Sequence, residues 1–138
     1  MEDALTTPAA ANPLAAPRAD RLRPVAMQDP ANDALRGELF DALLAEGRAE
    51  EAAALAQQVP AEAAGPAWRY RLGVAQARAA QWDAAAATLG ELCATLVPAP
   101  PAALHELALV QLRRGQDAEA VRLLAEVTAP DEHLRALP

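Results

Sequence analysis

The sequence predicts an all-α protein, an α–α superhelix of three helical hairpins with about six to seven antiparallel helices. Alanine is the commonest residue and isoleucine is absent, which favours closely packed helices over strands. After Asp29 the leucines recur at helical spacing. One phrase also occurs twice, as EGRAEEAAAL at 46–55 and as RGQDAEAVRL at 114–123, which indicates an internal repeat.

Residues 1–29 are predicted to form a disordered or extended tail rich in Pro and Ala. Prolines interrupt this segment every few residues, and proline removes a helical hydrogen bond. The tail includes the basic stretch RADRLR at 18–23, which we interpret as solvated. The alternative is a docking segment that becomes ordered on a partner.

The repeat domain is expected to span residues 30–138. Asp29 is the predicted N-cap of its first helix, Pro30 occupies the first helical position, and Gly47 ends that helix. Glycines and prolines then divide the remaining chain into helices expected at about 49–59, 61–79, 82–96, 102–114 and 117–127. Residues 131–137 begin a further helix or a short cap. The repeats are expected at about 33–64, 66–98 and 101–130.

Aligning Gly47, Ala80 and Gly115 gives a period of about 34 residues made of two helices. A small residue at each of these turns permits a tight hairpin. The same alignment superimposes two further sets, Ala52 with Ala85 and Ala120, and Leu39 with Leu72 and Leu107. Small side chains in the first set let paired helices cross closely.

These residues resemble the tetratricopeptide repeat (TPR) over about residues 31–130. Leu72–Gly73 matches the Leu-Gly pair of the first repeat helix, and Ala85 and Pro98 follow near their expected places. Gln76 and Gln111 depart from the pattern, because the family usually has an aromatic residue there. The resemblance implies a right-handed superhelix whose first helices line a concave groove.

By this resemblance, the groove-facing and partner-binding residues are Asp41, Leu44, Tyr70, Val74, Ala77, Arg78, His105, Leu109, Leu112 and Arg113. Arg78 and Arg113 stand at equivalent places among apolar neighbours. This mixture fits an amphipathic helix or an extended peptide that carries acidic groups. The family's clamp for chaperone C-termini needs Lys and Asn in the groove, and their absence disfavours that partner. Solvated arginines without a binding role are the alternative interpretation.

No catalytic, cofactor-binding or metal-binding residues are predicted, and we do not expect an enzyme. The chain contains no Ser and no Lys, and His105 and His133 have no second histidine at ligand spacing. Cys93 is interpreted as a buried structural thiol. The acidic pair Glu50–Glu51 starts a predicted helix and complements its dipole.

The formal net charge of −7 argues against a nucleic-acid partner, which would need a basic face. The N-terminus does not resemble a signal peptide and no stretch is apolar enough to span a membrane, so we expect a cytoplasmic protein. The Ala- and Arg-rich composition is typical of a GC-rich bacterial genome.

The predicted function is a non-catalytic scaffold, an adaptor or small chaperone that binds another protein in its groove. The alternative is a structural or regulatory subunit of a larger bacterial assembly, such as a secretion system or an enzyme complex. Such a subunit would be bound through the convex face or the tail. The sequence does not decide whether the protein forms homo-oligomers.

Overall fold

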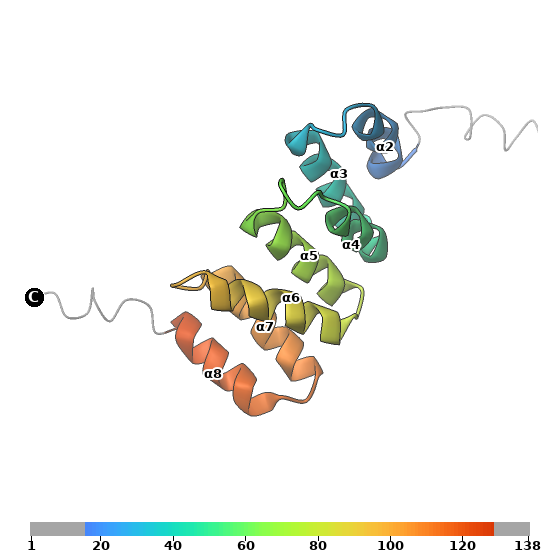
Figure 1. The fold of residues 1–138 in the computed structure, drawn as a ribbon. Helices are drawn as coiled ribbons and strands as arrows, with labels where there is room; N and C mark the ends of the chain where they lie inside the picture. Colours follow the sequence, from blue (N-terminus) through green and yellow to red (C-terminus); the bar gives the residue numbers. More distant parts are fainter. Residues whose placement is uncertain (1–15, 129–138) are drawn as a thin grey trace, which may run out of the picture. The chain divides into compact units, whose positions relative to one another are not determined.

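The computed structural model describes residues 16–128, which form seven α-helices and no strand (Figure 1). This confirms the predicted all-α fold of TPR-like helical hairpins. The helices are α2 (Arg18–Gln28), α3 (Asp33–Ala45), α4 (Ala49–Gln57), α5 (Pro66–Arg78), α6 (Trp82–Thr95), α7 (Pro101–Arg113) and α8 (Asp117–Thr128). The chain divides within α4, between Ala52 and Ala53, into two compact units. The predicted helix at 131–137 and residues 1–15 lie outside the described part.

The turns after α3, α5 and α7 share one backbone conformation. Gly47, Ala80 and Gly115 have φ angles of 74°, 60° and 76°, in the left-handed region that favours glycine. In each turn the next residue donates its N–H to a carbonyl five residues earlier, as in the bond from Gln81 to Gln76 at 2.9 Å. This pattern ends a helix in a Schellman motif. The aligned positions of the sequence are therefore also equivalent in the structure.

The small residues that follow each turn are fully buried. Ala52, Ala85 and Ala120 each have 0% of their surface exposed. A larger side chain at these points would have no space to occupy in a close-packed interior. Alanine thus occupies the positions at which close packing requires a small side chain.

The predicted tail is wrong for Arg18–Gln28, because these residues form helix α2 and pack against α3. Pro17 is the N-cap, and Pro24 lies inside the helix. An internal proline is unfavourable for an isolated helix, but tertiary contacts can outweigh local propensity. Here the contacts come from charged side chains of α3, of the α3–α4 turn and of α4, which the proline spacing does not reveal.

Two predicted helix starts also shift. Helix α3 begins at Asp33, because Asn32 and not Asp29 is the N-cap, and the Asn32 side chain accepts a 3.0 Å hydrogen bond from the Leu35 N–H. Helix α5 begins at Pro66, five residues later than expected, with Gly65 as its N-cap. Proline is preorganised for the first helical position, and it fixes this start.

In the C-terminal unit, α5 packs against α6, α6 against α7, and α7 against α8 (Figure 1). The core there includes Leu89, Leu104, Leu107 and Val110. Helices α5 and α6 cross closely at Gly73, where an added Cβ would lie 2.5 Å from Cδ2 of Leu89. The crossing therefore has room for glycine alone.

Gln76, which departs from the TPR pattern, is buried with 6% of its surface exposed. Its side-chain oxygen accepts a hydrogen bond from the Thr88 hydroxyl at 2.7 Å, which joins α5 to α6. Buried polar groups are tolerated when they are paired. A polar link thus replaces the aromatic contact expected from the family.

Candidate protein-binding clefts

Helices α5 and α7 contact each other in the C-terminal unit, and their C-terminal turns hold an open cleft. We call it the α5–α7 cleft; its volume is about 490 Å³. The residues that line it are Ala77, Arg78, Trp82, Glu106, Leu109, Val110, Leu112 and Arg113. Five of the predicted partner-binding residues therefore lie together: Ala77, Arg78, Leu109, Leu112 and Arg113.

The cleft combines exposed aliphatic side chains with an apolar floor. Leu109 and Leu112 have 42% and 44% of their surface exposed, whereas Val110 and Ala77 are buried. Leu109 and Leu112 lie three residues apart on α7, so they point to the same side of the helix. Covering such side chains with an apolar group of a ligand is favourable.

Arg78 is already paired within the chain. Its two terminal nitrogens each lie 3.3 Å from a carboxylate oxygen of Glu106, and only 12% of the Glu106 side chain is exposed. The positive charge of Arg78 is therefore largely balanced before any partner arrives. Tyr70 is affected as well: burial, and the nearby charge of Glu106, raise the pKa of its hydroxyl group.

Arg113 is in a different situation. Its guanidinium carbon lies 5.6 Å from the centre of the Trp82 ring, within the range of a cation–π interaction. Between residues 16 and 128, no ion pair joins Arg113 to a carboxylate. The side chain is exposed, and it is the cation of this cleft that remains available to an acidic ligand.

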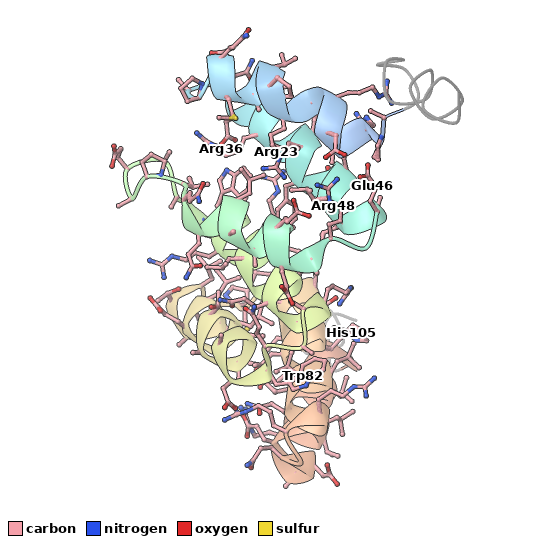
Figure 2. The ribbon with its side chains drawn as sticks, turned by 90° about the vertical axis from the view of Figure 1, so that its right-hand side faces the viewer. Arg23, Arg36, Glu46, Arg48, Trp82 and His105 are labelled. Carbon is pink, nitrogen blue, oxygen red and sulfur yellow. The ribbon has the colours of Figure 1, made fainter. Side chains whose placement is uncertain are left out.

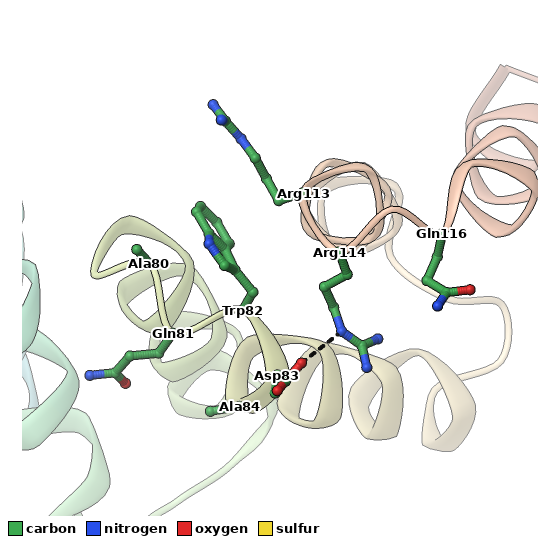
Figure 3. Close-up of a pocket in the computed structure, with 8 residues that line it drawn as sticks. All are labelled: Ala80, Gln81, Trp82, Asp83, Ala84, Arg113, Arg114 and Gln116. Carbon is green, nitrogen blue, oxygen red and sulfur yellow. Dashed lines mark hydrogen bonds and ion pairs between the residues drawn. The ribbon is translucent and has the colours of Figure 1, made fainter.

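A second cleft adjoins the first at the hairpin turns (Figure 3). This turn-end cleft has a volume of about 550 Å³ and is lined by Ala80, Gln81, Trp82, Asp83, Ala84, Arg113, Arg114 and Gln116. Arg114 donates from Nε to Asp83 at 3.0 Å, as the dashed line in Figure 3 shows. Trp82 and Arg113 line both clefts, so together they form the boundary between an apolar and a polar cleft.

The other predicted residues lie elsewhere. Val74 is buried, and Tyr70 is half-buried against the core and lines a separate apolar hollow of about 280 Å³. His105 is exposed but does not line the α5–α7 cleft. Asp41, which is exposed, and Leu44, which is half-buried, belong to α3 in the N-terminal unit.

Sequence reasoning missed Trp82 and Glu106 as cleft residues. The TPR resemblance assigns the groove to the first helix of each hairpin, and Trp82 opens a second helix. Glu106 does not stand out in the sequence, because its role depends on Arg78, which is 28 residues away. The available signal was charge balance, since an arginine expected among apolar residues calls for a nearby carboxylate.

Cys93 is half-buried, and burial raises the pKa of its thiol, which disfavours the reactive thiolate. Across the described part of the chain, no three His, Cys, Asp or Glu side chains cluster as a metal site would require. His133 and the pair Asp131–Glu132 lie outside that part. None of the described helices combines the length and apolarity needed to cross a bilayer.

Residues 16–128 thus have the fold of an all-α helical-repeat protein with open clefts on its surface. Residues 9–70 match the family model described as "Tetratricopeptide repeat", which supports a TPR-like repeat. The match includes helix α2, within the segment predicted to be a tail. Comparisons with curated proteins and with solved structures gave no match. TPR repeats generally mediate protein–protein interactions and form a family of non-enzymatic scaffolds.

Proposed function

We propose that this protein is a binding module, an adaptor or small chaperone, that holds a segment of another protein in the α5–α7 cleft. The observation that carries the proposal is the combination at the end of α7. Two exposed leucines, Leu109 and Leu112, lie beside Arg113, a cation without a carboxylate partner among the described residues. An isolated exposed leucine is ordinary, but this grouping in a cleft indicates a binding surface.

The charges define the chemistry of the partner segment. A carboxylate that approaches Arg113 meets no competing carboxylate, whereas one that approaches Arg78 must displace Glu106. We infer a segment with an aliphatic residue that covers Leu109 and Leu112, and an acidic residue next to it that reaches Arg113. An amphipathic helix and an extended peptide both satisfy this description.

The test begins with capture of partners from a lysate of the source organism on the immobilised full-length protein. Wild type, Leu109→Asp and Val121→Asp are compared by quantitative mass spectrometry. Val121 is the matched control, because it is a 64% exposed aliphatic residue on α8, outside the cleft. The proposal expects a partner that is lost with Leu109→Asp and retained with Val121→Asp.

Calorimetry with that partner then tests the charge assignment. A charge-assisted hydrogen bond contributes about 1.5 kcal/mol or more, so Arg113→Ala should weaken binding about tenfold. Arg78→Ala should have a smaller effect, because its carboxylate partner is internal. A partner lost with Val121→Asp and kept with Leu109→Asp would overturn the cleft proposal. That result would favour the structural-subunit alternative.

A further inference from the structure

Helix α2 is held against the rest of the N-terminal unit mainly by charged groups, with little apolar burial. Ala19 is the only residue of this helix that is fully buried. Leu22, Arg23 and Ala26 are half-buried on the same stripe, and the aliphatic residues Val25 and Met27 are 51% and 73% exposed. Burial of one methyl side chain and of half a leucine gives a small hydrophobic stabilisation.

Four polar contacts fasten the first half of the helix, and three residues that take part in them, Arg23, Glu46 and Arg48, are labelled in Figure 2. Arg18 pairs with Glu38 of α3, and Arg23 pairs with Glu51 of α4 at 3.0 Å. The Ala19 N–H donates to the Glu46 carboxylate at 3.0 Å. Asp20 pairs with Arg48 at 2.9 Å. We call this set of groups the α2 latch.

Arg48 is the centre of the latch. Besides Asp20, its guanidinium contacts Glu46 at 3.2 Å and Glu51 at 2.6 Å. Glu46 and Glu51 in turn hold the Ala19 N–H and Arg23. Removal of Arg48 would therefore loosen three of the four contacts and leave three carboxylates, those of Asp20, Glu46 and Glu51, without their shared cation.

Contacts of this kind depend on ionic strength. The paired side chains are mostly a quarter to a half exposed, and salt screens exposed charges over a Debye length of about 10 Å at 0.1 M. Apolar contacts do not weaken in this way. In addition, the 11-residue helix contains Pro24, so it has little stability once it leaves α3.

We propose that α2 is an electrostatic strap that undocks and unfolds as one segment when ionic strength rises, while α5–α8 stay folded. Its release uncovers the side of α3 that it packs against. It also frees the carboxylates of Glu38, Glu46 and Glu51, which contact α2 in the docked state. The basic stretch at 18–23, for which the sequence leaves a solvated tail or a docking segment open, thus docks on its own chain. The α2 latch shares no residue with the α5–α7 cleft.

Hydrogen exchange of the full-length protein tests the strap. Amides of α2 are compared at about 0.05 M and about 1 M sodium chloride, at constant pH, with amides of α7 as the internal reference. The proposal expects protection in α2 to fall by about tenfold or more, with no matching change in α7. Equal salt responses of the two helices, or an unchanged α2, would overturn it.

Variants then distinguish the latch from a general salt effect. Arg48→Gln should reduce α2 protection at low salt to the level that wild type shows at high salt. Arg122→Gln is the matched control, because Arg122 also pairs with two carboxylates, Glu119 and Glu126, but both lie in its own helix α8. The control should leave α2 unchanged. Wild-type protection of α2 in Arg48→Gln would contradict the proposal.

A charge swap supplies a positive test. Arg18→Glu and Glu38→Arg should each weaken α2 protection, and the double variant should restore most of it because the pair is re-formed with reversed charges. Losses that simply add in the double variant would show that the Arg18–Glu38 pair does not hold the helix. That outcome would count against an electrostatic strap.

Discussion

Helices α2 and α5 are similar in length, with 11 and 13 residues, but they are held in different ways. Helix α5 buries Trp68 and the whole run from Gly73 to Ala77, and it crosses α6 closely. Helix α2 buries Ala19 and relies on ion pairs. The comparison teaches that a helix in a repeat protein can be part of the core or an attachment to it. The number of side chains that the helix buries distinguishes these two cases.

The largest expected effect tests the core side of this comparison. Ala85→Leu places extra methyl groups at a fully buried position of α6, and such overpacking costs about 1–3 kcal/mol. Ala84→Leu is the control, since Ala84 is exposed one residue earlier. Denaturant melts followed by circular dichroism measure both. Equal stability of the two variants would show that the α5–α6 core is not tightly packed.

Changes at the hairpin turns should have an intermediate effect on stability. The same backbone conformation occurs at turns in both units. Ala80 has φ of 60°, where a side chain costs about 1–2 kcal/mol, so Ala80→Gly should raise stability by about 1 kcal/mol. Gly47→Ala is the reciprocal change and should lower stability by a similar amount. Space is not the limit there, since nothing lies within 4 Å of an added Cβ. Melts in which both changes have the same sign would contradict this reasoning.

The smallest effect on overall stability concerns acid and α2. Hydrogen bonding to Arg48 lowers the pKa of the Glu51 carboxyl, so this carboxylate favours the docked helix at neutral pH. That stabilisation is complete above the ordinary glutamate pKa of about 4.3 and is lost as pH falls through the lowered value. Asp20, Glu38 and Glu46 are the other carboxylates that face Arg18, Arg23 and Arg48.

We therefore expect α2 amides to lose protection below about pH 4, after correction for intrinsic exchange, before the amides of α5 do. Arg48→Gln should remove much of this pH dependence because the carboxylate loses its partner. Equal loss of protection in α2 and α5 on acidification would show that α2 is not more sensitive to acid than a helix held by apolar packing.

The sequence alone predicts the helical hairpins, but it does not predict helix α2. Gly47 and Gly115 mark turns by residue type alone, and Ala80 could be placed because the spacing of the repeat required it. Helix α2 depends on partners 20 to 28 residues away, such as Glu38 for Arg18 and Glu51 for Arg23. Local proline spacing contains no information about such pairs, so it led to the wrong prediction.

The candidate site was predictable to a similar extent. Leu109, Leu112 and Arg113 follow from helical spacing on α7 together with the family resemblance, and the structure places them in one cleft. The difference between Arg78 and Arg113 was not predictable, since both occupy equivalent repeat positions. It arises because Glu106 reaches one arginine and Trp82 lies beside the other.

The buried pair of Gln76 and Thr88 has a consequence for how α5 and α6 find each other. The fit of Leu89 against Gly73, where only glycine has room, already restricts the offset of α6 along α5. A slide of α6 by one turn would bring Ala84 or Leu92 to the place of Thr88. The Gln76 amide would then be buried without its partner, at a cost of about 1–3 kcal/mol. The polar pair thus penalises the same displaced alignments that the close contact of Leu89 with Gly73 disfavours.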